Sequence, residues 1–591
     1  MELRQDVKSH SIFHAIFIIM DFNLLKKNLK KDFTNLPEIK IAVLGDSATQ
    51  LLSQTLKGYG YTQGMHFNIW EADYNQIYQT VSDEDSPLYT SKPDYVIIFQ
   101  SSKKLLSGFY KENNANKKTF AQDQIAFVEK LTDTINSRIK CTIIYLNFTE
   151  INDAVFGNFS NKLDISFLYQ LRLLNVALMK LSGRKKNVNI CDLSTIQNTL
   201  GSKTSSSEKF YITTDNVLEI DVLPVVAKNI TDIILAYTGK FKKCLIIDLD
   251  NTMWGGIIGD DGMEGIQIGD LGIGKAFTKF QQWIKQLKER GIILAVCSKN
   301  TEHLAKEPFE KHPDMILRLT DIAVFVANWK NKADNIRHIQ SILNIGFDTM
   351  VFLDDSPFER EMVKKEIPEI AVPNLPEDPA EYLSFLYEQN LFETTSYTEE
   401  DTKRNDQYRE EAERTILQHT YTNEDEFLQS LKMTADLQPI NKFTLPRAAQ
   451  LTQRSNQFNL RTIRYTEEQL KIITEDKNKY TLTVSLQDKF GDYGLISLII
   501  AEKKGDTDIF IDTWIMSCRV LKRNVEQLVL NEMVTLARQH NFKRIVGEYI
   551  PTPKNGLVKD HFKTLGFINQ KDQWVLIVGD YTGKTTFINK Q

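Results

Sequence analysis

The residues best suited to chemistry in this sequence are two aspartates one residue apart, Asp248 and Asp250. They follow the apolar run Cys244–Ile247, which predicts a buried strand of a parallel sheet. Ligands of open α/β sheets bind at the carboxyl ends of such strands. There, Asp248 could attack a phosphorus atom, and Asp250 could protonate the leaving group and later activate water. Together with Thr252, this pair predicts phosphoryl transfer.

Two carboxylates at this spacing repel each other and also repel a phosphate, so the site is expected to need a cation. Ligands that are all oxygen atoms favour Mg²⁺. The short pattern Asp-x-Asp-x-Thr also fits a turn rich in Asp and Asn. The prediction therefore depends on further polar groups at the ends of other strands.

Three further apolar runs are predicted strands, and each leads into polar residues that suit the same chemistry. The runs and these residues are 292–296 with Ser298, 322–326 with Lys332, and Met350–Leu353 with Asp354 and Asp355. A hydroxyl can bind a phosphate oxygen, a lysine can neutralise the transferred group, and paired acids can complete a metal shell. Each residue alone could be a strand cap, a solvated helix residue or a helix N-cap. Their joint occurrence favours one site.

This set resembles the haloacid dehalogenase (HAD) superfamily of phosphotransferases. The resemblance implies an aspartyl-phosphate mechanism at the carboxyl edge of a Rossmann-like sheet. It implies catalysis by Asp248 and Asp250, phosphate or substrate binding by Asn251, Thr252, Ser298 and Lys332, and Mg²⁺ binding by Asp248, Asp250, Asp354 and Asp355.

Two longer runs narrow the resemblance to the FkbH-like branch of this superfamily. They are Trp-Gly-Gly-Ile-Ile-Gly-Asp-Asp-Gly at 254–262 and Phe-Leu-Asp-Asp-Ser-Pro-Phe-Glu-Arg-Glu at 352–361. The branch implies a glyceryl-type acyl phosphate as substrate and an acyl carrier protein, whose phosphopantetheine thiol accepts the acyl unit. Met253 and Ser356 stand where Leu and Asn are common, and neither touches this chemistry. The alternative is a plain Mg²⁺-dependent phosphatase with non-catalytic binding domains.

Cys297, next to Ser298, is a further catalytic candidate that could hold the acyl unit as a thioester. A buried, small apolar side chain is the commoner fate of a cysteine. Strand alternation also places Cys297 and Ser298 on opposite faces of the sheet. Both interpretations of Cys297 stay open at this level.

The composition is that of a soluble globular protein with several domains. The chain has 591 residues, 42% hydrophobic and 25% charged, and a net charge of −5, which gives no general attraction to nucleic acid or an anionic membrane. Its five cysteines include no Cys-x-x-Cys pair, which predicts reduced thiols in a cytoplasm.

The predicted fold class is α/β, with three domains of different kinds. The expected order is an N-terminal extension (1–37), an SGNH-hydrolase-like, flavodoxin-like domain (38–235), a HAD Rossmann-like domain (240–375), a helical connector (376–430) and a GNAT-like α+β domain (431–591). Predicted strands of the first domain lie at 40–44, 95–99, 142–146 and 188–191.

The run Gly45-Asp46-Ser47 resembles the first block of SGNH hydrolases, in which the serine is the nucleophile. Such a serine needs a histidine base, and the sequence has no His between His66 and His303. The position usual for the base, shortly after Asp192, reads Leu-Ser-Thr. The domain is therefore predicted to lack this triad. Docking of the carrier protein or acyl chain is its remaining functional option.

The last domain resembles GNAT acyltransferases, where a helix N-terminus holds the pyrophosphate of coenzyme A. The matching loop here is Arg519-Val-Leu-Lys-Arg-Asn524, with Lys and Asn in the usual glycine places. Arg519, Lys522 and Arg523 are still expected to bind the phosphate of phosphopantetheine or coenzyme A. The alternative is that they form a solvated surface.

Overall fold

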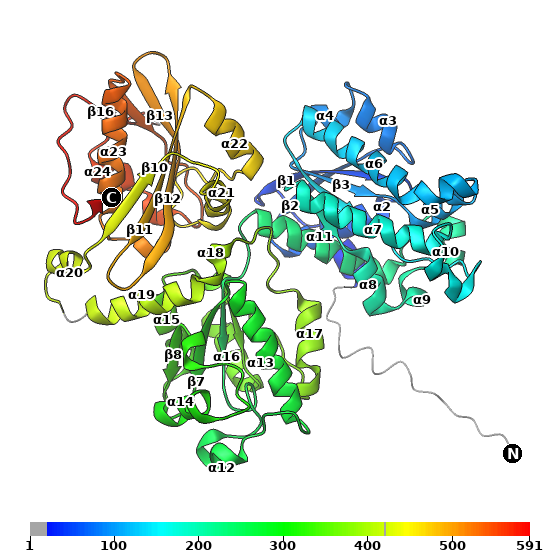
Figure 1. Cartoon of the computed structure of the whole chain (residues 1–591), viewed down its shortest axis with the longest axis horizontal. Coiled ribbons are helices and arrows are strands. Elements are labelled where there is room, and N and C mark those ends of the chain that lie inside the picture. The colour runs from blue at the N-terminus through cyan, green and yellow to red at the C-terminus, as the bar shows by residue number, and fades with distance from the viewer. Residues whose placement is uncertain (1–20, 419–420, 572) are drawn as a thin grey trace. The chain divides into compact units, whose positions relative to one another are not determined.

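The computed structural model describes residues 21–418, 421–571 and 573–591. Residues 1–20 of the predicted N-terminal extension lie outside this range. The chain divides into two compact units, with the boundary between Ile234 and Leu235 (Figure 1). Among the described helices, none combines the length and apolar character needed to cross a membrane.

The first unit is built on a five-stranded parallel sheet with the order β2-β1-β3-β4-β5. Its strands are β1 (Glu38–Gly45), β2 (His66–Glu71), β3 (Tyr95–Phe99), β4 (Thr142–Leu146) and β5 (Val188–Cys191). This order is that of flavodoxin-like sheets. β2 has no predicted counterpart, because it is an edge strand with only one fully buried residue and so has no continuous apolar run.

Helices cover this sheet, and α6 and α7 pack on the face formed by alternate residues such as Leu44 and Ile98. The helices are α1 (Phe22–Asn28), α2 (Gln50–Thr62), α3 (Ile77–Ser82), α4 (Pro87–Thr90), α5 (Ser102–Phe109), α6 (Asn114–Arg138), α7 (Phe167–Arg184), α8 (Leu193–Leu200), α9 (Ser202–Ser205), α10 (Glu208–Thr214) and α11 (Leu223–Tyr237). Part of the predicted extension is thus folded. α1 packs on α2, where a Cβ at Gly58 would lie 2.2 Å from the Leu25 carbonyl oxygen.

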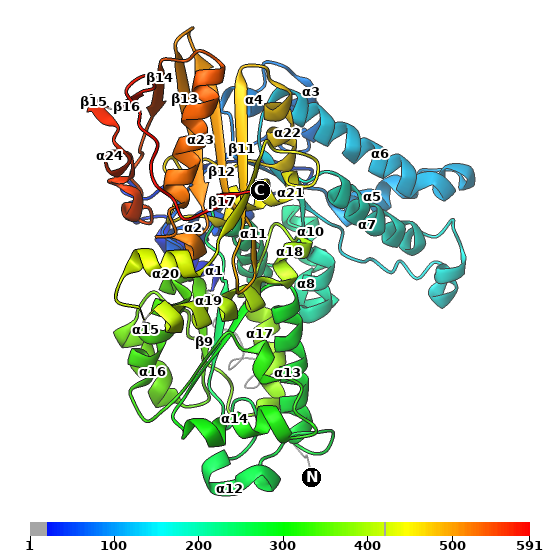
Figure 2. The ribbon, with the colours of Figure 1, turned by 60° about the vertical axis from the view of Figure 1, so that its left-hand side comes forward.

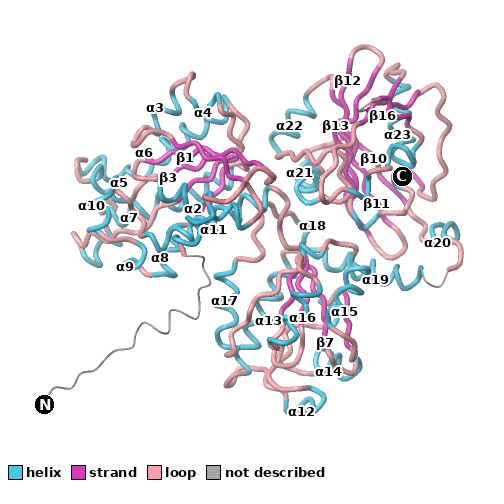
Figure 3. Tube along the Cα trace, turned by 180° about the vertical axis from the view of Figure 1, so that it is seen from behind, coloured by secondary structure: helices cyan, strands magenta, loops and turns pink. Residues whose placement is uncertain are grey.

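The second unit contains two sheets, drawn as separate groups of strands in Figure 3. The smaller sheet is parallel and has the order β8-β7-β6-β9. Its strands are β6 (Cys244–Ile247), β7 (Ile293–Ser298), β8 (Val324–Ala327) and β9 (Met350–Leu353). Compared with the prediction, β7 extends to Ser298, and β8 begins only after the turn that holds Asp321.

Helices lie on both faces of this parallel sheet (Figure 2). α13 (Gly274–Glu289), α14 (Glu302–Lys311) and α17 (Tyr382–Gln389) cover the face that carries Leu245 and Val296, whereas α15 (Lys332–Leu343) and α16 (Pro357–Glu366) cover the face that carries Ile246 and Cys297. Coverage of both faces explains why these strands are continuous apolar runs. A short helix, α12 (Ile258–Gly265), follows β6.

The predicted connector is not one helix. After α17 it continues as α18 (Glu399–Thr402), α19 (Arg404–Gln418) and α20 (Glu424–Ser430), with loops between them. α19 contributes polar side chains to both sheets of the second unit. The Asn405 Oδ1 accepts a hydrogen bond from the Leu294 N–H, and the Gln407 Nε2 donates to the Asp492 carbonyl.

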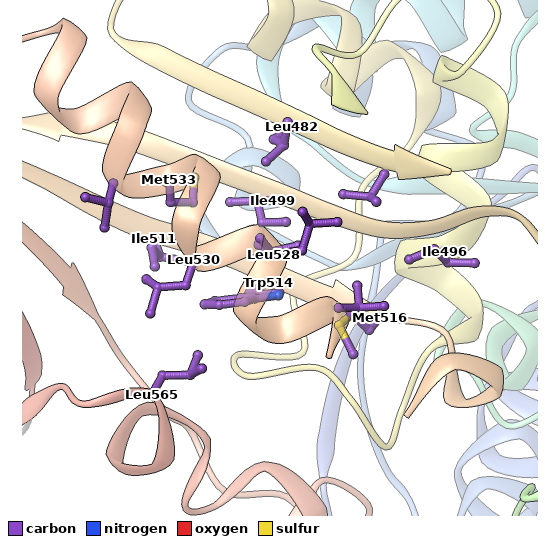
Figure 4. Close-up of a cluster of buried hydrophobic side chains, with 14 of the residues drawn as sticks. Leu482, Ile496, Ile499, Ile511, Trp514, Met516, Leu528, Leu530, Met533 and Leu565 are labelled. Carbon is purple, nitrogen blue, oxygen red and sulfur yellow. The ribbon is translucent and has the colours of Figure 1, made fainter. Parts of the chain in front are cut away.

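The larger sheet has eight strands in the order β15-β16-β14-β13-β12-β11-β10-β17. They are β10 (Thr434–Gln438), β11 (Lys479–Gln487), β12 (Asp492–Lys504), β13 (Asp508–Met516), β14 (Arg544–Gly547), β15 (Ile568–Gln570), β16 (Gln573–Ile577) and β17 (Asn589–Lys590). Its helices include α21 (Leu445–Arg454), α22 (Glu467–Glu475), α23 (Val525–Gln539) and α24 (His561–Leu565). α23 buries Leu528 and Met533 against Trp514 of β13 (Figure 4).

β13 and β14 are a parallel pair that diverges beyond Ile511 and Gly547. The opening between them is filled by the chain's own segment from Phe458 to Leu460. The Leu460 N–H donates to the Trp514 carbonyl, and the Met516 N–H donates to the Phe458 carbonyl. On the other side, the Ile550 N–H donates to the Leu460 carbonyl at 2.9 Å. This segment therefore closes the gap with backbone hydrogen bonds on both sides.

A buried ion pair joins α19 to the larger sheet, and its removal is expected to destabilise the second unit. The Arg414 guanidinium forms two bonds to Asp488, at 2.7 and 2.8 Å, and both side chains are almost fully buried. Arg414→Met would leave the Asp488 carboxylate buried without its partner, which costs about 3–5 kcal/mol. Chemical denaturation measures this loss.

The matched control is Arg409→Met on the same helix. Arg409 forms a partly exposed 3.8 Å pair with Asp406 and donates a hydrogen bond to the Thr320 carbonyl at 2.8 Å, so its loss should cost only about 1 kcal/mol. Equal stability of the Arg414 and Arg409 variants would contradict the proposed contribution of the buried pair.

Candidate phosphoryl-transfer site

Three carboxylates meet at the carboxyl edge of the smaller sheet of the second unit. Asp248 follows β6, and Asp354 and Asp355 follow the neighbouring strand β9. One oxygen of each carboxylate lies within 4.8 Å of the others. Because β6 and β9 are parallel neighbours in register, their ends bring acids that are about a hundred positions apart in sequence into one cluster.

Lys332, the first residue of α15, lies against this cluster. Its Nζ is 3.0 Å from Asp248 Oδ2 and 2.6 Å from Asp354 Oδ2, and all three side chains are buried. Burial alone would lower the pKa of Lys332, but the charges of Asp248 and Asp354 raise it above its ordinary value. Burial, together with the charge of Asp248, raises the pKa of Asp354 to about 7, although Lys332 opposes this shift. Three acids thus meet one lysine in this cluster.

These residues fit a divalent cation. The Asp248 Oδ1 is buried, and within the described part of the chain it has no hydrogen-bond partner. Burial, together with the charge of Asp248, also raises the pKa of Asp355. An unpaired buried carboxylate oxygen beside two further carboxylates is a set of hard oxygen donors of the kind that Mg²⁺ binds.

Asp250 is held by three donors around its two carboxylate oxygens. Oδ1 accepts hydrogen bonds from the Trp254 Nε1 at 3.1 Å and the Ile258 N–H at 3.0 Å, and Oδ2 accepts one from the Asn300 Nδ2 at 2.8 Å. Burial raises the pKa of Asp250, and these hydrogen bonds oppose the rise. The raised pKa favours the protonated form that a general acid needs.

Asn300 was not among the predicted site residues, although it lies two positions after Ser298. It is buried, and its amide connects the Asp250 carboxylate to the Ser298 hydroxyl, which lies 3.4 Å from Nδ2. We interpret Asn300 as a positioning residue that fixes the orientation of Asp250. In the sequence, the polar residues at the end of β7 were the available signal for Asn300. The contact between its side chain and Asp250, which follows β6, can be seen only in the folded structure.

Asn300→Ala is expected to lower kcat for phosphate release roughly 10- to 100-fold, as loss of a supporting hydrogen bond does in comparable sites. KM should change little, because Asn300 acts through Asp250. Steady-state kinetics with a small phosphate ester measure both constants. Glu302→Gln, at an exposed pair on α14, is the control and should behave as wild type. An unchanged kcat in Asn300→Ala would exclude the positioning role.

The other predicted residues of this site differ in their exposure and contacts. Ser298 and Thr252 are buried at the edge, and the Thr252 Oγ1 accepts a hydrogen bond from the Asp355 N–H at 3.1 Å. Asn251 has a positive φ of 53°, and its Oδ1 accepts from the Gly256 N–H at 2.9 Å. Its side chain thus stabilises the turn after β6. The structure thus gives Asn251 a conformational role at this turn, and its predicted role in substrate binding stays a prediction.

Cys297 lies on the opposite face of β7 from Ser298, in the apolar layer with Ile246 and Ala295. Its thiol is fully buried beside the Lys332 carbonyl, with an Sγ–O distance of 3.7 Å, and burial raises the pKa of this thiol. A nucleophilic cysteine needs access and a thiolate. This environment favours the structural interpretation of Cys297 over the catalytic one.

Arg360 was also missed, and it supports the loop that carries two of the acids. Its guanidinium NH1 donates to the Asp354 carbonyl at 2.8 Å and to the Asp355 carbonyl at 2.7 Å. The residue belongs to the quoted run 352–361, but that run does not show that its side chain turns back onto the strand end.

The predicted phosphate-binding arginines of the last domain are used inside the protein. Arg519 is buried, bonded to Gln407 and, at 3.0 Å, to the Tyr493 carbonyl. Arg523 is buried in a 2.9 Å ion pair with Glu411. Lys522 alone is exposed. The two arginines therefore do not form a solvated surface, and their burial and protein partners do not favour the predicted joint binding site.

In the first unit, Asp46 and Ser47 follow β1, and Ser47 is almost fully buried. Asp192 caps α8, since its Oδ1 accepts a hydrogen bond from the Thr195 N–H. The Leu-Ser-Thr run after Asp192 is thus the first turn of a helix. The SGNH-type chemistry of this unit remains without support.

Comparison with known proteins gives a family model that matches part of the chain and a solved structure that is similar to most of it. Residues 40–235 match the model of the FkbH N-terminal domain. A crystal structure of the N-terminal part of protein BF1531 from Bacteroides fragilis, which contains a phosphatase domain and was determined in complex with Mg, is 51% identical. The similarity covers 64% of this chain and 99% of that chain, with a TM-score of 0.62. No curated protein matches this chain in sequence.

Acetyltransferase structures are more distant. Ard1 from Thermoplasma volcanium is 13% identical, covers 24% of this chain and 95% of its own, and has a TM-score of 0.19. The ribosomal-protein-S18-alanine N-acetyltransferase from Escherichia coli is 10% identical, covers 26% and 99% of the two chains, and has a TM-score of 0.20. Scores this low support no conclusion about the larger sheet or its activity.

Proposed function

Because this chain belongs to the FkbH-like family of HAD-superfamily phosphatases, we propose that it is a Mg²⁺-dependent enzyme that acts on a glyceryl-type acyl phosphate and loads the acyl unit onto the thiol of an acyl carrier protein. The observation that carries the phosphatase part is the buried group of Asp248, Lys332 and Asp354 at the carboxyl edge of the parallel sheet. The carrier-protein part rests on the resemblance described above.

Mg²⁺ would be held by Asp248, Asp354 and Asp355, with the Asp250 backbone carbonyl, and would supply positive charge next to the phosphate oxygens. The Asp248 carboxylate attacks phosphorus and forms an aspartyl phosphate. Asp250, oriented by Asn300, donates a proton to the leaving oxygen and then accepts one from the water that hydrolyses this intermediate. The Lys332 ammonium neutralises charge on the transferred group.

Attack of Asp248 on phosphorus releases the acyl unit as a carboxylate, which cannot acylate a thiol, so loading is a separate reaction of the intact acyl phosphate. The carrier thiolate attacks the acyl carbon, the bond from that carbon to the bridging oxygen breaks, inorganic phosphate leaves and the thiol proton passes to the phosphate. No acylated cysteine of the enzyme takes part. The buried thiol of Cys297 supports this choice, since it points into the apolar layer behind β7. The phosphopantetheine arm of the carrier would bring its own thiol to the site, so no second nucleophile of the enzyme is needed.

The test is to incubate the purified protein with Mg²⁺, a glyceryl-type acyl phosphate and carrier protein in its phosphopantetheinylated form. Released phosphate and the intact mass of the carrier are measured together. The expected result is phosphate release accompanied by a carrier heavier by one acyl unit. Carrier lacking phosphopantetheine is the matched control and should remain unmodified.

Asp248→Asn separates enzymatic loading from spontaneous acylation, because it should lose both readouts. Phosphate release with no acylated carrier at any carrier concentration would favour the alternative, a plain Mg²⁺-dependent phosphatase with non-catalytic binding domains. Equal acylation by wild type and Asp248→Asn would reject the proposal that this site drives loading.

A further inference from the structure

We propose that the first unit has a binding site of its own, for a flexible arm that carries secondary amides on an otherwise apolar chain. The site is a cavity of about 430 Å³, which lies within the roughly 300–1,000 Å³ typical of small-molecule sites. It is lined by residues after β1 and β3 together with side chains of α3, α5 and α6.

The cavity lies at the topological switch point of the parallel sheet. β1 lies between β2 and β3, its successors in sequence, which pair with it on opposite sides. In open α/β sheets ligands bind outside the carboxyl ends of the strands at such a point. Asp46, the first residue after β1, and Gln100, the first residue after β3, both line the cavity.

The ends of β1 and β3 are adjacent, since the Asp46 N–H donates to the Phe99 carbonyl. The Asp46 side chain therefore offers a hydrogen-bond acceptor beside the donor that the Gln100 side chain offers. Both Asp46 oxygens accept from the Ser101 N–H at 3.0 Å and keep further lone pairs. The Gln100 Oε1 accepts from the Tyr145 hydroxyl at 2.5 Å. This bond fixes the amide so that its NH₂ is the remaining group, and that NH₂ has no protein partner within the described residues.

Part of the cavity wall is apolar. The buried side chains of Ile77, Leu105 and Phe120 line it, together with the half-buried Phe127. Lys104 also lines it, but its ammonium donates to the Asp46 carbonyl and, at 2.8 Å, to the Tyr74 hydroxyl. The lining therefore combines an apolar wall with polar side chains, which also include Asn75, Gln79 and Gln124.

A secondary amide matches this arrangement. Its N–H can donate to the Asp46 carboxylate while its carbonyl accepts from the Gln100 NH₂, and the methylene groups on either side pack on the walls. A free anion would instead meet the carboxylates of Asp46 and Glu112, and a free cation would meet Lys104. The geometry thus points to a neutral, amide-bearing chain, the chemistry of a pantetheine arm.

Such an arm occurs in free pantetheine derivatives and on carrier proteins. The inference deepens the proposed function by giving the arm of the carrier a second contact outside the phosphoryl-transfer site. Binding is measured without turnover, so its failure is distinguishable from failure of the proposed reaction. In particular, Asp248→Asn should bind the arm as tightly as wild type does.

The experiment is calorimetric titration of the full chain with S-methylpantetheine, whose blocked thiol cannot form disulfides. Saturable binding at one site per chain is expected. The comparison ligand is 1,8-octanediol, a soluble chain without amides, which should bind at least about tenfold more weakly because it leaves the polar pair unmatched. Coenzyme A and the phosphopantetheinylated carrier are titrated in the same way to distinguish the two sources of the pantetheine arm. The source that binds more tightly is the physiological one.

Two lining variants and one matched control test the location. Gln100→Glu keeps an acceptor for Tyr145 but removes the NH₂ donor, and Phe127→Ala removes part of the wall, so each should weaken binding at least about tenfold. Gln122→Ala changes an exposed residue of the same helix, α6, that does not line the cavity, and should bind normally.

Thermal unfolding and circular dichroism like those of wild type would show that the first unit of the lining variants is folded. The inference is overturned if wild type shows no saturable binding of S-methylpantetheine, coenzyme A or carrier. It is equally overturned if octanediol binds as tightly as S-methylpantetheine, or if both folded lining variants bind like Gln122→Ala.

Discussion

Asp248→Asn is expected to abolish phosphate release, with a loss on the order of 10³- to 10⁵-fold, as for removal of other covalent nucleophiles. The neutral amide is a poor nucleophile and a weaker metal ligand than the carboxylate. The change also removes one of the two acids that pair with the Lys332 ammonium, which would then pair with Asp354 alone. Release of inorganic phosphate from an acyl phosphate measures the effect.

The control for Asp248→Asn is Asp260→Asn, which changes an exposed acid in the first turn of α12 beyond the cluster. It should retain wild-type activity. Thermal unfolding of both variants shows whether the fold is intact. If a folded Asp248→Asn protein keeps more than a few per cent of the activity, Asp248 is not the nucleophile.

Removal of Mg²⁺ by a chelator is expected to lower activity by about 10³-fold, because a metal ion contributes several kcal/mol of charge stabilisation in such reactions. Added Mg²⁺ should restore the rate. The reason lies in the three carboxylates within 4.8 Å and the unpaired Asp248 Oδ1. Activity that persists in excess chelator would contradict this prediction.

Mg²⁺ binding also has a readout that does not depend on activity. A ligand that binds only the folded state stabilises it by about 2.7 kcal/mol at a concentration 100 times its Kd. Mg²⁺ should therefore raise the thermal midpoint of the wild type. Asp354→Asn should lose most of this rise, whereas the exposed variant Asp260→Asn should keep it.

The parallel sheet of the second unit could be predicted from the sequence because all four of its strands are buried on both faces. They read as apolar runs, and polar residues follow each of them. The acids and Lys332 come together as these runs imply. The edge strand β2 escaped prediction for the opposite reason, since most of its residues are only half-buried and its pattern is weak.

Contacts between distant segments were beyond the sequence. Arg519 and Arg523 precede a helix and look like a phosphate-binding pair, but their partners, Gln407 and Glu411, lie 112 residues earlier on α19. Likewise, Asn300 follows the end of a strand, as many solvated residues do. Only the pairing of β7 with β6 shows that its amide donates a hydrogen bond to the Asp250 carboxylate. The local sequence pattern identifies residues of a suitable type, whereas the partners of their side chains depend on the order of the strands in the sheet.

The segment from Phe458 to Leu460 has a consequence for how the last domain can be used. It occupies the divergence of β13 and β14 as a built-in strand, bonded to Trp514 and Met516 on one side and to Ile550 on the other. An extended ligand that sought the same backbone donors would have to compete with a tethered occupant at very high effective concentration. This position of the sheet is thus already filled by the chain itself, so a ligand of the last domain would have to bind elsewhere on its surface or displace this segment.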